Sequence, residues 1–227
     1  MIVRSFSKSK NPKKVIITLH GWTGDISSME PVANAWGLDD VKWVLVQAPY
    51  IATNGGFTWF DGNEDIGWKY QDSFDILSKL ISKLNDQGFP NHAIYILGFS
   101  QGACLSMEFM IRQTFSLGGI IPIAGFIRYK ERFKQDVLNE SRNTRVLLLH
   151  GDKDEVILPE QSQISFELLK GAGFETQLHI LAARHKVPLQ AKNLIENMGG
   201  KILFYNSKAV SYTHLRANET REERGCR

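Results

Sequence analysis

The sequence predicts an α/β fold in which helices cover both faces of a mostly parallel sheet. Short continuous runs of apolar and β-branched residues recur along the chain, and such runs suit strands buried on both faces. The segments between them carry apolar residues at helical spacing, so strands and helices alternate. This alternation implies right-handed crossovers between parallel strands. With 227 residues, the chain is long enough for one such domain with a sizeable core.

The apolar runs define the strands. We predict six of them, at residues 15–19, 41–46, 93–97, 117–124, 145–149 and 174–181. Between the second and third runs, residues 50–67 form a long loop rich in glycine and aromatic residues. Loops of this length are usually functional or disordered, and the aromatic residues argue against disorder. A polar, partly helical excursion is expected at residues 125–143.

The helices follow from apolar spacing and from their end signals. We predict five helices. The first ends at about residue 36, and the other four span about residues 70–84, 101–115, 159–169 and 188–197. Ser27 or Ser28 is placed to cap the first helix. Gly88 ends the second, and Pro159 suits the first position of the fourth.

Composition and charge exclude several classes of protein. Hydrophobic residues make up 43% and charged residues 22% of the chain, as in a globular protein. A net charge of +3 gives no argument for nucleic acid as a partner. Two cysteines cannot form a disulfide framework, so a reducing compartment is the default. No apolar run has the length of a signal peptide or a membrane helix, so we expect a cytoplasmic protein without a stable membrane anchor.

One motif carries chemistry. The pentapeptide Gly98-Phe99-Ser100-Gln101-Gly102 has the pattern G-x-S-x-G and lies between a predicted strand and a predicted helix. In that context it predicts a nucleophile elbow, a strained turn that exposes the serine hydroxyl. A Cβ at Gly98 or Gly102 would clash with the neighbouring strand and helix. The start of the helix also favours negative charge developing at Ser100.

A serine nucleophile needs a histidine base and a carboxylate that orients the base. In enzymes with this elbow the order along the chain is Ser, then Asp or Glu, then His. Acidic candidates after Ser100 stay open on spacing alone: Asp136, Asp152, Asp154 and Glu160. The histidine candidates are His150, His179 and His185. We favour His185, because it follows the last strand in a loop, whereas His150 precedes Asp154 and His179 lies within a strand.

Acyl transfer also needs donors for the oxyanion. One is expected from the backbone N–H of Gln101, the residue after the nucleophile. The other is expected from the loop after the first predicted strand, at the backbone N–H of Trp22.

Taken together, these motifs resemble the phospholipase/carboxylesterase family of small α/β-hydrolases, which includes the acyl-protein thioesterases. The resemblance covers about residues 14–198. It is carried by Leu19-His20-Gly21-Trp22-Thr23-Gly24-Asp25, Ala48-Pro49, Trp59-Phe60-Asp61, the serine pentapeptide, His150-Gly151-Asp152-Lys153-Asp154-Glu155-Val156-Ile157 and Arg184-His185-Lys186-Val187-Pro188. It implies an α/β-hydrolase fold and a serine carboxylesterase mechanism that needs no metal or cofactor. It also implies Asp154 rather than Asp152 as the acid, and oxyanion donors at Trp22 and Gln101.

The chain departs from the family pattern in places. Ala103 replaces a common glycine, which is a small change. Arg184 stands where a glycine often precedes the histidine, so the loop before His185 can differ in shape from that of the family. No lid insertion is evident, which predicts an accessible site without a large lid. Trp59 and Phe60 are candidates for an acyl pocket, with core packing as the alternative. The loop at residues 50–67 also contains the acidic residues Asp61, Glu64 and Asp65. A solvated surface explains them better than a metal site.

We therefore expect a carboxylesterase that acts on a small-molecule or lipid-like ester. Acyl-protein thioesterase or lysophospholipase activity is the alternative within the enzyme class, and a non-catalytic binding protein of the same fold is the alternative outside it. The sequence leaves the acyl chain, the alcohol group and the oligomeric state open.

Two segments are expected from composition. Residues 1–208 form the α/β-hydrolase domain. Residues 209–227 have little apolar content and resemble translated cloning sequence, so we expect a non-native or disordered tail.

Overall fold

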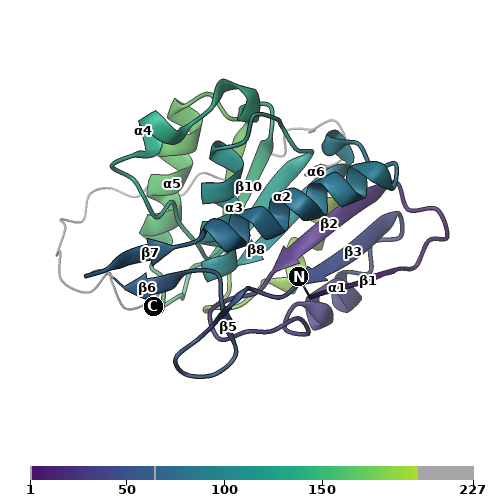
Figure 1. The fold of residues 1–227 in the computed structure, drawn as a ribbon, viewed down its shortest axis with the longest axis horizontal. Helices are drawn as coiled ribbons and strands as arrows, with labels where there is room; N and C mark the ends of the chain where they lie inside the picture. Colours follow the sequence, from purple (N-terminus) through teal and green to yellow (C-terminus); the bar gives the residue numbers. More distant parts are fainter. Residues whose placement is uncertain (1, 64, 199–227) are drawn as a thin grey trace.

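A seven-stranded sheet forms the centre of the protein, as seen in a computed structural model that describes residues 2–63 and 65–198 (Figure 1). The strand order is β1-β3-β2-β8-β9-β10-β11. The strands are β1 (Val3–Ser7), β2 (Lys14–Leu19), β3 (Val41–Val46), β8 (Ile94–Phe99), β9 (Gly119–Ile123), β10 (Arg145–Gly151) and β11 (Thr176–Leu181). Only β1 runs antiparallel to its neighbour within this sheet. The predicted mostly parallel sheet is confirmed.

The six apolar runs of the sequence are the six parallel strands. In β2 the five residues from Val15 to Leu19 are all buried, as expected for a strand covered on both faces. The outer strand β11 begins at Thr176, two residues later than predicted, and it is only partly buried. The sequence analysis did not identify β1, a short edge strand in which Val3 pairs with Val46.

Helices cover both faces of the sheet, as predicted. On one face, α2 (Gln71–Asp86), α3 (Gln101–Ile111) and α5 (Pro159–Gly171) pack on side chains such as Ile17 and Leu148. On the other face, α1 (Glu30–Trp36) and α6 (Lys192–Met198) pack on alternate side chains of the same strands. The remaining short helices are η1 (Asn91–Ala93), α4 (Phe133–Asp136), η2 (Asn139–Ser141) and η3 (Leu189–Ala191).

Some helix ends differ from the prediction. The expected serine cap of α1 is wrong: the cap residue is Met29 and makes no side-chain bond, because the hydroxyls of Ser27 and Ser28 instead donate to Oδ1 of Asp25. Helix α3 ends at Ile111 rather than near residue 115. The last predicted helix is two pieces, η3 and α6.

The long loop at residues 50–67 contains structure that the sequence analysis did not predict. It forms two small antiparallel hairpins, β4 (Tyr50–Ile51) with β5 (Phe57–Thr58) and β6 (Asp61–Asn63) with β7 (Gly67–Lys69). Both lie at the end of the sheet where β2 and β8 finish (Figure 1). Within the described residues, no large lid covers this end.

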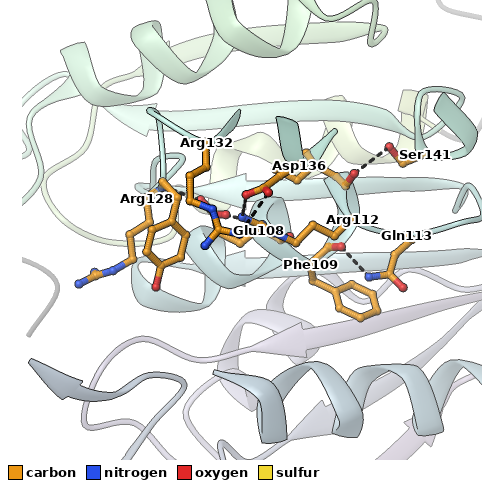
Figure 2. A network of polar contacts seen from close by, with 10 residues as sticks. Glu108, Phe109, Arg112, Gln113, Arg128, Arg132, Asp136 and Ser141 are labelled. Carbon is orange, nitrogen blue, oxygen red and sulfur yellow. Dashed lines mark hydrogen bonds and ion pairs between the residues drawn. The ribbon is translucent and has the colours of Figure 1, made fainter. Parts of the chain in front are cut away.

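A buried ion-pair network ties α3 to the polar excursion at residues 125–143 (Figure 2). Glu108, in a helix whose residues are all buried, accepts hydrogen bonds from the backbone N–H groups of Arg128 and Tyr129 at 2.6 and 3.0 Å. Its other oxygen pairs with Arg112 at 2.5 Å, and Arg112 also pairs with Asp136 at 2.5 Å. These contacts fix the path of the chain between β9 and β10.

Among the helices of the described residues, none is long and apolar enough to cross a bilayer. The predicted tail, residues 209–227, lies outside the described part of the chain, as do residues 199–208 of the predicted domain.

Candidate active site

Ser100 lies in a strained turn between β8 and α3. Its φ of 53° is in the left-handed region, which a residue with a side chain rarely adopts. The turn is held by the Ser100 N–H, which donates to the Ile123 carbonyl at 2.8 Å. A Cβ on Gly98 would overlap the Gly102 carbonyl oxygen, and one on Gly102 would lie 2.7 Å from the His20 carbonyl oxygen. Both glycines are therefore required for the steric reason that the motif predicts.

The structure brings Ser100, His185 and Asp154 together from three strand ends. The His185 Nε2 atom lies 3.1 Å from the Ser100 hydroxyl, and its Nδ1 atom lies 2.7 Å from Oδ2 of Asp154. We therefore assign the ring hydrogen to Nδ1, which faces the carboxylate, and this leaves the Nε2 lone pair facing the Ser100 hydroxyl. Ser100 and Asp154 are buried, and the side chain of His185 is 19% exposed.

The Asp154 carboxylate is held by four hydrogen-bond donors. Its Oδ1 atom accepts from the backbone N–H groups of Val156 and Ile157, both at 3.0 Å. Its Oδ2 atom faces His185 at 2.7 Å and His150 at 3.2 Å. Burial alone would raise the pKa of Asp154, but the hydrogen bonds from His150, His185 and Ile157 outweigh it and hold the pKa well below its ordinary value. This carboxyl is therefore ionised at neutral pH.

The other acidic candidates lie in different surroundings. Asp152 accepts the backbone N–H of Ala183 at 3.1 Å, so it anchors the loop that carries His185. Asp136 pairs with Arg112 in the network of Figure 2. Glu160 is in the first turn of α5. In the part of the chain that the structure describes, none of the three has a hydrogen bond to His185.

The two other histidines also differ from His185. His179 is a half-buried residue of β11, and burial lowers its pKa. His150 is fully buried, and its Nε2 atom lies 3.2 Å from the same Oδ2 atom of Asp154 that faces His185. Its order in the sequence excluded His150 as the base, but no sequence signal indicated that it would share the carboxylate.

His20 orients the loop that carries Trp22. The Ala48 N–H donates to Nε2 of His20 at 3.1 Å, so the ring hydrogen is on Nδ1, which lies 2.7 Å from the Gly21 carbonyl oxygen. The C=O and N–H of one trans peptide point in opposite directions. Holding the Gly21 carbonyl toward His20 therefore turns the Trp22 N–H the other way. Burial lowers the pKa of His20, against smaller opposing effects from the Gly21 carbonyl and Asp25, which favours this neutral ring.

The same loop is also fixed against β5 and against the serine. The Thr23 N–H donates to the Phe57 carbonyl at 3.0 Å, and the Phe57 N–H donates to the Gly24 carbonyl at 2.9 Å. A Cβ on Gly21 would lie 3.5 Å from the Ser100 Cβ, so the loop runs directly beside the elbow. Within the described residues, the Trp22 and Gln101 N–H groups donate to no protein acceptor.

The side chain of Gln101 has a structural part that sequence reasoning missed. Its Oε1 accepts the Trp59 N–H at 2.9 Å, and its Nε2 donates to the Thr58 hydroxyl at 2.9 Å. The Thr58 hydroxyl in turn donates to the Phe60 carbonyl at 2.9 Å. Gln101 therefore fixes residues 58–60 against the first turn of α3.

A cavity of about 460 Å³ opens beside Trp22, between the two hairpins. Its walls include Trp22, Ile51, Thr58, Phe60, Asp61 and Trp68. Phe60 thus lies on the cavity wall. Trp59 is completely buried, packs against the His20 ring and donates from its indole N–H to the His20 carbonyl at 2.8 Å, so it supports the site from the core.

Two acidic residues of the loop at residues 50–67, Asp61 and Asp65, line the cavity. Asp61 and Asp65 are exposed on the second hairpin, and Glu64 lies outside the described residues. No group of three His, Cys, Asp or Glu side chains in the described part of the chain is placed to hold a metal ion.

The sequence matches the phospholipase/carboxylesterase family over residues 3–197. Among its relatives, acyl-protein thioesterase 1 of Gibberella zeae is 31% identical over 176 residues, which cover 70% of this chain and 74% of that protein. The carboxylesterase SOBER1 of Arabidopsis thaliana is 27% identical over 175 residues, which cover 70% of this chain and 76% of that protein.

Solved structures share the fold. The esterase PE8 superposes with a TM-score of 0.76 at 23% identity, over 86% of this chain and 97% of that one. SOBER1 of Arabidopsis thaliana superposes with a TM-score of 0.72 at 22% identity, over 82% of this chain and 96% of that one. At this level of identity the likeness establishes the fold alone.

Proposed function

The chain belongs to the phospholipase/carboxylesterase family of hydrolases, and on that premise we propose that it is a carboxylesterase with a serine acyl-enzyme mechanism. The observation that carries the proposal is the chain of contacts from Asp154 through His185 to Ser100, at 2.7 and 3.1 Å. Both distances are within the reach that proton transfer requires.

Each residue has one part in the reaction. The Ser100 hydroxyl attacks the ester carbonyl carbon while Nε2 of His185 takes its proton. The N–H groups of Trp22 and Gln101 stabilise the oxyanion that develops. His185 then protonates the leaving alcohol, and water repeats the sequence to release the acyl group from the serine. Asp154 orients His185 and stabilises its protonated form throughout.

The cavity beside Trp22 supports a site for one substituent of the substrate, because Trp22, whose N–H is the proposed oxyanion donor, lies on its wall. Phe60 supplies an apolar wall there and Thr58 a polar one. This mixed lining suits a small-molecule or lipid-like ester. We also propose a cytoplasmic location, supported by the small number of cysteines.

Acyl-protein thioesterase activity is the second candidate, because relatives of about 30% identity carry that name. An oxyanion site and a serine nucleophile serve esters and thioesters alike. The lysophospholipase and non-catalytic alternatives have no separate observation in their favour.

A panel of p-nitrophenyl esters of rising acyl length, run beside matched acyl thioesters, tests the proposal. We expect ester turnover that depends on acyl length and is lost by about 10⁶-fold in kcat in Ser100→Ala, the typical effect of removing a triad nucleophile. A higher kcat/KM for every thioester than for its matched ester would favour the thioesterase. Absence of turnover with every substrate in the wild type would favour a binding protein.

A further inference from the structure

The His150 ring lies beside the proposed triad but has no part in the mechanism above. It is fully buried at the end of β10. Its Nδ1 atom lies 2.6 Å from the Ser162 hydroxyl of α5. Its Nε2 atom lies 2.8 Å from the Ile157 carbonyl oxygen and 3.2 Å from Oδ2 of Asp154.

The neighbours of the ring determine how many hydrogens it carries. A carbonyl oxygen and a carboxylate only accept, so Nε2 must carry a hydrogen. The Ser162 hydroxyl oxygen also lies 2.8 Å from the Gly125 carbonyl oxygen, which can only accept, so we assign the single hydroxyl hydrogen to that contact. Its oxygen can therefore only accept from Nδ1, and that nitrogen must carry a hydrogen as well. A histidine with both nitrogens protonated is positively charged.

We propose that His150 is a positioning residue that, as a buried imidazolium, shares Oδ2 of Asp154 with His185. Its effect on turnover rests on the proposed function. The ion pair compensates the buried carboxylate charge, and the second hydrogen bond fixes the plane in which Asp154 meets His185. The positive charge also opposes protonation of His185 across the shared oxygen.

The surroundings of the ring contain few other charges. Asp154 is on the loop that follows β10, and His185 lies across its carboxylate. Helix α5 presents the Ser162 hydroxyl, and the segment after β9 presents the Gly125 carbonyl. Among the described residues, no other ionisable side chain has a hydrogen bond or ion pair with His150.

Nitrogen-detected NMR of the full chain tests the protonation state without reference to activity. Resonances that disappear in His150→Asn identify the ring. We expect both of its nitrogens to show bonded hydrogens in the folded protein. A bare Nδ1 in the wild type at neutral pH would overturn the proposal, even if the protein hydrolysed no ester.

The pH profile of kcat/KM tests the consequence for the reaction, with two substitutions at one position. His150→Gln places an amide N–H near the former Nε2 and keeps the bond to Asp154, whereas the shorter His150→Asn loses it. Both remove the charge, so we expect the acid limb of both profiles to move toward higher pH. His150→Asn should also lose between about tenfold and a hundredfold in kcat, because Asp154 loses one of the four donors that orient it toward His185.

Ser162→Ala tests the charge of His150 separately from its hydrogen bond to Asp154. It removes the acceptor of the Nδ1 hydrogen and leaves the Nε2 contact with Asp154, so the acid limb should move while the plateau kcat stays near the wild-type value. Ser165→Ala is the matched control, because Ser165 is also buried on α5 but bonds to Ile127 and Gln161. It should leave the profile unchanged.

Thermal unfolding of each variant shows whether it folds. Folded His150 and Ser162 variants that keep the wild-type acid limb would overturn the proposal. Esterase activity that persisted in Ser100→Ala would instead contradict the proposed function, while the NMR result for His150 would stand by itself.

Discussion

At the residue scale, hydrogen-bond partners account for the state of each group around Ser100. Asp154 is ionised because four donors surround it, and His20 is neutral because it must accept from Ala48 while it donates to Gly21. The main-chain atoms at the site are therefore oriented by buried side chains.

The role of His20 gives a prediction about the oxyanion donor. His20→Gln removes the Nδ1 hydrogen that holds the Gly21 carbonyl, so the Trp22 N–H loses its fixed direction. We expect kcat/KM to fall by about tenfold to a hundredfold, somewhat less than complete removal of such a donor costs. Steady-state kinetics with a p-nitrophenyl ester measure it. His179→Gln is the control on β11 and should affect stability rather than kcat/KM; equal losses in the two variants would contradict this role.

The lowered pKa of Asp154 gives a prediction about stability. In the unfolded chain an aspartate has a pKa of about 3.9, so below that pH the unfolded chain binds this proton first. The stabilisation from ionised Asp154 is thus present above about pH 4 and is lost as pH falls further. Urea unfolding of the wild type and Asp154→Asn at pH 7, 5, 4 and 3 should show a stability difference that shrinks on acidification. A difference that grows toward pH 3 would show the opposite sign.

The sequence predicts which residues meet at the site better than it predicts what supports them. Ser100, Asp154 and His185 follow from one motif, a resemblance and their order, and the structure places them within hydrogen-bond distance. The side-chain bond of Gln101 to residue 59 joins segments 42 positions apart. Such partners depend on the packed fold, so no local pattern indicated them.

At the element scale, the strands buried on both faces were predictable because short continuous apolar runs are typical of such strands. Strand β1 and the two hairpins at residues 50–69 are short and lie at edges, where burial leaves little pattern in the sequence. The cap of α1 was mispredicted because Asp25 competes for both serines.

The Glu108 network gives a prediction about the stability of α3. Glu108→Ala leaves the N–H groups of Arg128 and Tyr129 without their acceptor and leaves Arg112 short of one partner. Removing one member of a buried pair costs about 3–5 kcal/mol in the free energy of unfolding, which chemical denaturation measures. Arg132→Ala, at an exposed member of the same network, should cost less than about 0.5 kcal/mol. Similar losses in both variants would show that burial does not set the strength of this network.

At the scale of the whole molecule, the proposed catalytic groups all lie at one edge of the parallel sheet. The segments that follow β2, β8, β10 and β11 carry Trp22, Ser100, Asp154 and His185, and carboxyl ends of neighbouring parallel strands lie at one edge. The order β2-β8-β9-β10-β11 therefore sets the order of the groups across the site, with the loop of Trp22 and the loop of His185 on opposite sides of Ser100.

The composition of the last residues of the chain gives a prediction about the C-terminal segment. Residues 209–227 contain few sizeable apolar side chains, so we expect truncation after Lys208 to change kcat/KM by less than about twofold and the free energy of unfolding by less than ~0.5 kcal/mol. A thermal melt and an ester assay on both chains measure it. A large fall in either quantity would show that the segment is a native part of the protein.

Labelling with a fluorophosphonate, followed by mass spectrometry of the intact chain and its peptides, tests the central claim most directly. The reagent reacts with a serine only when a base and an oxyanion site activate it. The wild type should gain one adduct, located on Ser100, and lose its esterase activity in parallel; Ser100→Ala should gain none. An adduct on another residue, or esterase activity in Ser100→Ala within about tenfold of the wild type, would contradict the assignment of Ser100, His185 and Asp154 as the catalytic group.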